Sequence, residues 1–283
     1  MRPRQRTMEW QVVGACNYHC SYCIQSAKGR RGVPSPAQVE ASITGLAALP
    51  GSWEIKCSGG EAFAWSGFLD TLVPALMART PHNISVLTNL SASPRDLMRF
   101  VALCRGRLRV VSASLHLEAV TLEAFVAKAA WCADTLDPEV RFVVNQVVLP
   151  GREAEAAVCK RAFTEAGIRW FPQLYKVNGG VADYPDAAAL AALLGSSHDP
   201  RAANRAPSYR GRRCWAGVDY ATVDKDGAAW SCRTARRGGE GRLGNLLEGT
   251  LALWDEPRSC PYDICPCTVP ANRGMIEGVG GGS

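Results

Sequence analysis

The sequence has no apolar stretch that approaches the ~20 residues a membrane-spanning helix requires. The basic segment 1–6 is not followed by the apolar region of a secretory signal. These two absences predict a cytoplasmic protein, in which thiols stay reduced. The twelve cysteines of such a chain favour metal or cluster binding over disulfides.

Neither sign of charge is in large excess, since 32 lysine and arginine residues against 26 acidic residues leave a net charge of +6. Basic residues gather at 28–31, 210–213 and 233–237, but no RNA- or DNA-binding module accompanies them. We therefore expect no nucleic-acid partner. The mild positive charge suits an anionic cofactor or substrate.

Strand-like and helix-like segments alternate over the first 175 residues. Predicted strands cover 9–13, 53–58, 83–88, 109–115, 140–149 and 168–174. Predicted helices cover 35–49, 67–79, 94–105, 117–133 and 153–166. Six strand–helix units favour an α/β fold with a parallel sheet, because a parallel strand returns through a helical crossover. Six units are too few for a closed eightfold barrel, which leaves a partial barrel or a doubly wound sheet.

Polar residues stand where the predicted strands end. Residues 59–61 follow the second strand and residues 88–89 end the third. On the fourth strand, Ser112, Ser114 and His116 share one face by the two-residue period of a strand. Ligands of both fold types bind at the carboxyl ends of the strands. We therefore expect these polar groups to surround one mouth.

The predicted domains follow this division. Residues 1–178 form the strand–helix domain, and 179–210 form a connector with a short helix at 186–194. Residues 211–270 form a cysteine-rich module, with a hairpin at 218–223 and 228–231 and a short helix near 250–254. Residues 271–283 end in a glycine-rich run and are predicted to be a flexible tail. Because the first strand starts by residue 9, we expect no separate leader-peptide-binding domain before it.

Three cysteines lie on the loop that follows the first predicted strand. Cys16, Cys20 and Cys23 fit the spacing C-x3-C-x2-C. Three thiolates on one short loop can hold three irons of a [4Fe–4S] cluster and leave the fourth iron without a protein ligand. The alternative is structural zinc, which takes four protein ligands. His19 would then have to turn toward the same metal, and a disulfide would leave one cysteine over.

This cysteine motif, with Tyr22 before its last cysteine and Gly59-Gly60-Glu61 after the second strand, resembles the radical S-adenosylmethionine (radical SAM) superfamily. The resemblance covers roughly the first 175 residues. It implies a partial (β/α)6 TIM-like barrel. It also implies a cluster whose open iron chelates the methionine part of S-adenosylmethionine. One electron then cleaves the sulfonium, and the resulting 5′-deoxyadenosyl radical abstracts a hydrogen atom from the substrate.

The resemblance assigns roles to particular residues. Cys16, Cys20 and Cys23 would ligate the cluster, and Tyr22 would contact adenine unless it is simply a core aromatic. The edge that would accept the methionine ammonium consists of Gly59, Gly60 and Glu61. Four inner polar residues either bind ribose, the methionine carboxylate or substrate, or merely fill the barrel: Ser112, Ser114, His116 and Asn145.

The cysteine-rich module resembles the auxiliary-cluster extension of this superfamily, in its short "twitch" form rather than the full SPASM form. Its five cysteines are Cys214, Cys232, Cys260, Cys265 and Cys267. They suffice for one auxiliary [4Fe–4S] cluster with one cysteine spare. The ending C-x4-C-x-C departs from the SPASM spacing, so the ligating four stay open. A zinc ribbon is the alternative.

An auxiliary cluster with four protein ligands suits electron transfer. The resemblance therefore implies a net oxidation, a dehydrogenation or cross-link, of a natural-product intermediate or a short peptide. Flavodoxin or ferredoxin would supply the electron. If Cys260, Cys265 or Cys267 is free and returns a hydrogen atom, the enzyme is instead an epimerase. Rival hypotheses are an RNA-modifying member of the superfamily and a zinc-stapled, non-enzymatic binding protein.

Two smaller groups complete the sequence predictions. Four cysteines fall inside predicted helices or strands and are expected to be buried core residues. They are Cys57, Cys104, Cys132 and Cys159. Trp170, Phe171 and Tyr175, near the sixth strand, either line the substrate site or belong to the core.

Overall fold

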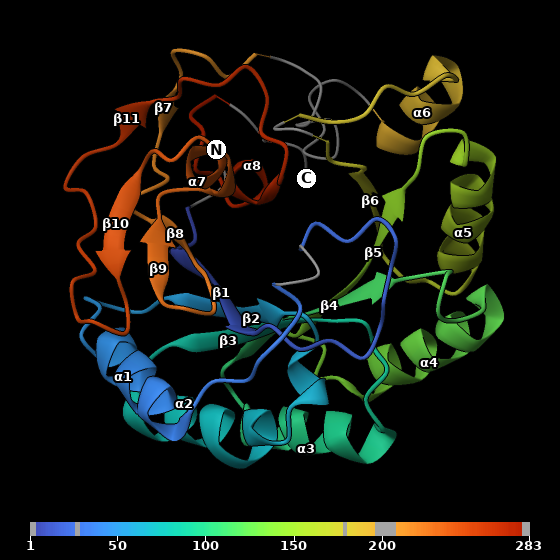
Figure 1. The fold of residues 1–283 in the computed structure, drawn as a ribbon. Helices are drawn as coiled ribbons and strands as arrows, with labels where there is room; N and C mark the ends of the chain where they lie inside the picture. Colours follow the sequence, from blue (N-terminus) through green and yellow to red (C-terminus); the bar gives the residue numbers. More distant parts are fainter. Residues whose placement is uncertain (1–3, 26–28, 178–179, 196–207, 279–283) are drawn as a thin grey trace.

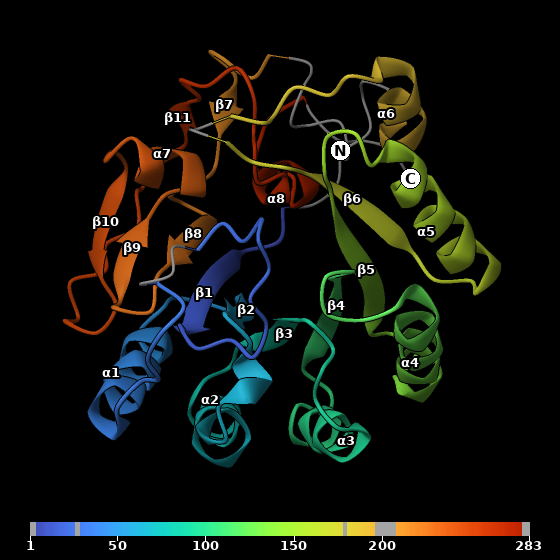
Figure 2. The same cartoon turned by 45° about the vertical axis from the view of Figure 1, so that its right-hand side comes forward.

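A computed structural model describes residues 4–25, 29–177, 180–195 and 208–278. Its main feature is a curved sheet of nine strands in the order β10-β9-β8-β1-β2-β3-β4-β5-β6. Helices α1 to α5 lie along the outer side of the curve (Figure 1, Figure 2). The strands of the first part are β1 (Thr7–Val13), β2 (Glu54–Gly59), β3 (Asn83–Thr88), β4 (Leu108–Leu115), β5 (Arg141–Val148) and β6 (Trp170–Leu174). The helices between them are α1 (Pro36–Ala47), α2 (Val73–Arg79), α3 (Pro94–Leu103), α4 (Leu122–Thr135) and α5 (Glu153–Glu165).

Strands β1 to β6 are all parallel, and each pairs with the strand that follows it in sequence. A doubly wound sheet would reverse its strand order at one point. The order from β1 to β6 has no reversal, and β6 does not return to pair with β1. The predicted α/β fold is confirmed, and it is the partial, open barrel.

Three of the helices α1 to α5 start at side-chain caps. Ser35 accepts a hydrogen bond from the backbone N–H of Gln38, whose side chain accepts one from the N–H of Ser35. This capping box satisfies two of the N–H groups that the first turn leaves free. Ser93 and Thr121 likewise cap the N-terminal ends of α3 and α4, each through its side-chain oxygen. Helices α3, α4 and α5 start a few residues after the strands that precede them, whereas a long loop separates β1 from α1.

The two faces of the sheet differ as the two-residue period predicts. On β4, Val111, Ala113 and Leu115 are buried in the main hydrophobic core against the helices. Ser112 lies on the other face and is also buried. The core takes up the four cysteines predicted to be there: Cys57, Cys104, Cys132 and Cys159. Polar groups are thus left for the inner side of the curve.

The cysteine-rich module continues the same sheet, which the sequence did not predict. Its hairpin is confirmed as β8 (Tyr220–Val223) and β9 (Ala228–Trp230), followed by β10 (Arg242–Asn245). Strand β8 pairs in parallel with β1, on the side opposite β2. Ala221, Val223 and Leu246 belong to the main core. Burial of these apolar side chains joins the module to the barrel.

Shorter elements complete the module and the connector. They are α6 (Ala187–Leu194), β7 (Arg213–Cys214), α7 (Arg233–Arg237), β11 (Arg258–Ser259) and α8 (Val269–Asn272). Helix α6 is the one predicted in the connector, and Asp186 caps it. Residues 178–179 and 196–207 of the connector lie outside the described residues. Of the helices in the described ranges, none is both long and apolar enough to cross a membrane.

Two expectations for the C-terminal part are wrong. No helix forms at 250–254, because its backbone N–H groups bond elsewhere: Ala252 donates to Leu243 and Trp254 donates to Gly217. The tail is not flexible from residue 271, since Met275 and Ile276 are buried and Ile276 bridges to Cys214. The packed segment extends through residue 278, and 279–283 lie outside the described residues.

Candidate active site at the carboxyl ends of the strands

The cysteine loop leaves the carboxyl end of β1. The start of the loop is bonded to its end, because the N–H groups of Gly14 and Ala15 both donate to the carbonyl of Gly32 at 3.1 Å. Cys20 is buried and Cys23 is exposed. Burial raises the pKa of the Cys16 thiol and of the Cys20 thiol. Both are therefore neutral until a metal displaces their protons.

The Cys16 sulfur already accepts a hydrogen bond. The backbone N–H of Tyr18 donates to Sγ of Cys16 at 3.4 Å. Such N–H donors stabilise a thiolate and tune the potential of a bound cluster. The arrangement fits the predicted ligand role of Cys16. The roles of Cys20 and Cys23 as ligands stay predictions.

The Gly59-Gly60-Glu61 edge lies directly against this loop. The N–H of Gly60 donates to the carbonyl of Val13, and the N–H of Glu61 donates to that of Ala15, each at 2.9 Å. A Cβ at position 60 would stand 2.1 Å from the Ala15 carbonyl oxygen. Only glycine tolerates that approach. Gly60 therefore allows the backbone after β2 to lie directly against the backbone of the cysteine loop.

The Glu61 carboxylate is used within the protein. Its side chain accepts hydrogen bonds from the Thr88 hydroxyl at 2.8 Å and from the N–H groups of Asn89 at 2.5 Å and Phe63 at 3.2 Å. Glu61 is 1% exposed, and burial raises its pKa to about 6. Three donors occupy most of the four acceptor positions of a carboxylate. Glu61 thus ties β2 to β3, and its contact with a methionine ammonium stays a prediction.

The end of β3 has unusual backbone geometry beside Glu61. Leu90 has a φ of 60°, in the left-handed region that a leucine rarely adopts. Its N–H donates to the Thr88 hydroxyl at 3.0 Å. The side chain of Asn89 donates to that of Asn17 at 2.9 Å, which in turn donates to Ser91. The cysteine loop is therefore held against the end of β3 by a small amide network.

Tyr22 and His116 meet at the end of β4. The Tyr22 hydroxyl lies 2.9 Å from Nδ1 of His116, and the two rings stack with centroids 5.8 Å apart. Burial lowers the pKa of His116 to about 4, so its ring is neutral and can accept the hydrogen bond. Tyr22 is outside the hydrophobic core, so the core-aromatic alternative is wrong. Its contact with adenine stays a prediction.

Glu118 is an anchor that sequence reasoning missed. The N–H of Ser21 donates to its carboxylate at 2.7 Å and the Ser21 hydroxyl donates at 2.5 Å. These bonds join the cysteine loop to the segment after β4. The two residues are 97 positions apart, so no local pattern could reveal the pair.

Two further predicted residues lie on the inner face of the sheet. The Asn145 amide donates to the Ser112 hydroxyl at 2.6 Å across β5 and β4. Asn145 is also the register partner of Ser114 on one side and of Phe171 on the other. Phe171 is buried outside the main core, whereas Trp170 lies within it and donates to the Gln146 side chain. Of the three aromatics, Phe171 thus joins this inner polar face.

Four cysteines of the module surround two small apolar clusters. Cys214, Cys260 and Cys265 pack against the cluster of Tyr209, Ala271 and Ile276. Cys214 and Cys232 pack against the cluster of Ala216, Tyr220 and Met275. Cys214 belongs to both, so the four thiols approach one another from β7, the start of α7 and the loops after β11.

Their sulfurs also meet backbone donors. Cys232 is the N-cap of α7, where the N–H of Ala235 donates to its sulfur at 3.3 Å. Burial raises the pKa of Cys214 to about 12 and that of Cys232 to about 11. Their loading with metal must therefore release protons.

Cys267 differs from the other four. It is 6% exposed and lies near enough to Glu9, Lys176 and Arg233 for their charges to act on its pKa. These residues belong to the inner side of the barrel. Its side chain also shares a hydrogen bond with that of Cys265, so it borders the same thiol group.

The spacing of the thiols bears on the kind of metal. Among the residues that the structure describes, no group of three or more His, Cys, Asp or Glu side chains is close enough to hold a single metal ion. A zinc ion draws its sulfur ligands to about 2.3 Å. An iron–sulfur cube binds each thiolate to a different iron and so spreads them. The choice between clusters and zinc stays a prediction.

Comparison with known proteins finds likeness in structure alone. No protein-family model matches the chain, and no curated protein does. Among solved structures, anSMEcpe with bound AdoMet (S-adenosylmethionine) superposes with a TM-score of 0.61 at 16% identity, over 87% of this chain and 78% of that one. The same protein with AdoMet and the Cp18Cys peptide gives 0.58 at 16% identity, over the same shares.

A second solved protein agrees. SuiB of Streptococcus suis, bound to S-adenosylmethionine, gives a TM-score of 0.61 at 15% identity. The match covers 87% of this chain but only 64% of SuiB, which is just under two thirds of its length. Both neighbours are radical SAM enzymes. At this level of identity the likeness shows that the chain has their fold.

Proposed function

We propose that this chain is a radical SAM enzyme with two [4Fe–4S] clusters that oxidises a peptide or a natural-product intermediate. One observation carries the proposal. The C-x3-C-x2-C loop sits at the carboxyl end of β1, directly against the Gly-Gly-Glu edge. It does so in a fold shared with proteins solved with bound S-adenosylmethionine.

The first cluster would be held by Cys16, Cys20 and Cys23. When bound, it supplies one electron that cleaves S-adenosylmethionine and so provides the hydrogen-abstracting radical. The chain's own residues orient the ligands. Asn17 and Ser21 fix the loop against β3 and β4, and Glu61 fixes the edge beside it.

The auxiliary cluster would be held by Cys214, Cys232, Cys260 and Cys265. These are the thiols that share the two small apolar clusters. Four protein ligands leave no iron open, so this site suits electron acceptance rather than substrate binding. That role supports a net oxidation, in which the substrate loses two electrons and two protons.

The substrate class is supported by the inner face and by the neighbours. Ser112, Asn145 and Phe171 offer hydrogen bonds and an aromatic surface on the side of the sheet away from the helices. A peptide is bound in one anSMEcpe structure. An electron carrier such as flavodoxin or ferredoxin would reduce the first cluster.

A second candidate, epimerisation, is favoured by the position of Cys267. Its thiol faces the inner charged residues more than the other four do. It would give a hydrogen atom to the substrate radical and become a thiyl radical. One electron and one proton from a flavodoxin-type carrier would restore it. In D2O an epimerised product gains one deuterium and keeps its oxidation state, whereas an oxidised product loses two hydrogens.

The direct test is formation of 5′-deoxyadenosine. Protein reconstituted with iron and sulfide without oxygen is mixed with S-adenosylmethionine and dithionite, with Cys16→Ala as the control. The proposal expects 5′-deoxyadenosine from the wild type and none from the variant. Equal, background amounts from both proteins would refute it.

A further inference from the structure

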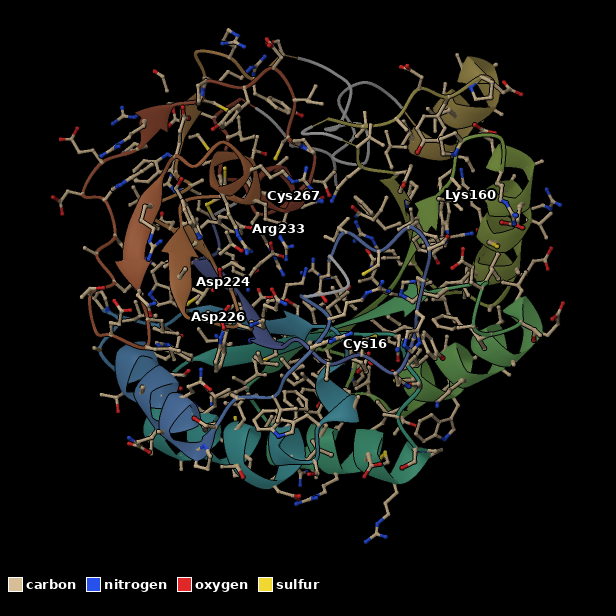
Figure 3. The ribbon with its side chains drawn as sticks, in the orientation of Figure 1. Cys16, Lys160, Asp224, Asp226, Arg233 and Cys267 are labelled. Carbon is tan, nitrogen blue, oxygen red and sulfur yellow. The ribbon has the colours of Figure 1, made fainter. Side chains whose placement is uncertain are left out.

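The inner side of the barrel holds a buried carboxylate, Glu9 on β1. Glu9 is 3% exposed, and its carboxylate accepts hydrogen bonds from the Tyr220 hydroxyl at 2.5 Å and from Nε of Arg233 at 3.0 Å. Nζ of Lys56 lies 3.4 Å away. Figure 3 shows Arg233 and Cys267 directed toward the inner side of the barrel. Glu9 is thus already paired with two cations.

More positive charge gathers here than Glu9 can balance. Lys176, just beyond β6, lies near enough to Cys267, Arg233, Arg237 and Glu9 for their charges to act on its pKa. Burial lowers that pKa and the two arginines lower it further, although Cys267 and Glu9 act in the opposite direction. Within the described parts of the chain, the Lys176 ammonium has no hydrogen bond or ion pair, and the terminal nitrogens of Arg233 have none either.

Four cations therefore share one carboxylate and the neighbouring Cys267 thiol. Placing an unpaired ammonium among other cations in a partly enclosed site costs free energy. That cost is offset when an anion enters and accepts hydrogen bonds from the free ammonium and guanidinium groups. Arginine forks and a lysine together suit the oxygens of a carboxylate or a phosphate.

We propose that Lys56, Lys176, Arg233 and Arg237 form a receptor for an anionic group of the substrate, a carboxylate or a phosphate, on the inner side of the barrel between β1 and α7. That the anion belongs to a substrate rests on the proposed function. The receptor itself rests on the charges and contacts.

The rival explanation is that these cations neutralise the auxiliary cluster. Lys176 also lies near Cys267. Under that explanation Lys176→Met would shift the spectrum of the reduced auxiliary cluster, and the reconstituted protein would not bind small anions. The two explanations therefore predict different results for anion binding.

The test uses the reconstituted full chain, with inorganic phosphate and acetate as probes in separate titration-calorimetry and thermal-unfolding series. We expect at least one probe to bind and to raise the unfolding temperature. Lys176→Met should weaken that binding about tenfold or more, since a charged hydrogen bond is lost. Without a probe, the variant should unfold no earlier than the wild type, because it loses an unmatched charge.

Lys160→Met is the matched control. Lys160 lies on α5, across the barrel from Arg233 (Figure 3), and its ammonium donates to the carbonyl of Ala192 on α6. Its loss should leave probe affinity unchanged. Arg237→Gln, at the exposed end of α7, should weaken binding in the same direction as Lys176→Met.

The outcomes separate the claims. Phosphate binding alone assigns a phosphorylated substrate, and acetate binding alone assigns a free carboxylate. Binding of neither probe, or equal binding by wild type and Lys176→Met, overturns the receptor. Anion binding in a protein that forms no 5′-deoxyadenosine would keep the receptor and refute the proposed function instead.

Discussion

The two groups of cysteines are held by different kinds of structure. Cys16, Cys20 and Cys23 come from one loop beyond β1, and Cys23 is exposed. The module's cysteines come from β7, the start of α7 and the loops after β11, and none of the five is exposed. A loop can present thiolates while leaving one side of a cluster open. Thiols that converge from several elements can close around a cluster.

The anchoring of the two regions differs in the same sense. The loop is tied to the barrel by side-chain hydrogen bonds, those of Asn17, Ser21 and Tyr22. The module is built into the sheet through the pairing of β8 with β1 and shares the main core. This difference matches the proposed function, in which the first site exchanges ligands at its surface and the second transfers electrons.

The largest effect is expected from the loop. Replacing Cys16, Cys20 or Cys23 singly by alanine should lower 5′-deoxyadenosine formation at least about a thousandfold, because the cofactor carries the chemistry. Iron should fall from about eight atoms to about four per chain, the content of one remaining cluster. Cys159→Ala, in the core, should keep both. Wild-type rates in all three loop variants would contradict the assignment.

The next effect concerns the module. Cys232→Ala should halve the iron content but keep formation of 5′-deoxyadenosine without substrate, because the loop site is intact. Substrate oxidation should be lost. Cys267→Ala should retain the full iron content, as the spare thiol. Iron and sulfide assays check both variants, and loss of half the iron from Cys267→Ala would reassign the ligands.

A moderate effect of pH on stability is expected from His116, which contacts the cysteine loop. The pKa of His116 is lowered to about 4 by burial, whereas an unfolded histidine titrates near about 6.5. Between these values the unfolded chain binds more protons, so stability falls as pH is lowered. From pH 7.5 to 5 the free energy of unfolding should drop by about 2 kcal/mol through this residue. Denaturant titrations of wild type and His116→Gln test this, and equal slopes with pH would contradict it.

The smallest effect is expected from Tyr22→Phe. It removes the hydrogen bond to His116 and keeps the stacked ring. The free energy of unfolding should fall by about 1 kcal/mol, the usual worth of one hydrogen bond. The control is Tyr18→Phe, since the Tyr18 hydroxyl makes no hydrogen bond within the described residues, and it should be neutral. A cycle with His116→Gln should give a coupling of about 1 kcal/mol between Tyr22 and His116.

Much of the barrel could be predicted from its sequence. The alternation of strand and helix patterns gave all six parallel strands, since apolar alternation and caps such as Ser35 act locally. The place of the hairpin could not be predicted. Its attachment to β1 depends on strand pairing between segments about two hundred positions apart, such as Thr7 with Tyr220. The predicted helix at 250–254 was wrong for a similar reason, because the backbone partners of this segment lie elsewhere in the chain.

The candidate site was predictable where chemistry imposes spacing. The thiols of the loop and the paired glycines are such cases, because a cluster and a close backbone contact each restrict the residue type. The anchors were not predictable. Asn17 with Asn89, and Ser21 with Glu118, are ordinary polar residues 72 and 97 positions apart. Glu61 was predicted at the edge, but its bonds to β3 were not.

The most direct test of the contrast is the electron paramagnetic resonance spectrum of the reduced, reconstituted protein, recorded with and without S-adenosylmethionine. The account predicts about eight irons and two cluster signals. The signal that Cys16→Ala abolishes should change when S-adenosylmethionine is added, and the one that Cys232→Ala abolishes should not. The account would be contradicted by two signals that both stay unchanged when S-adenosylmethionine is added, or by protein that takes up zinc and no iron.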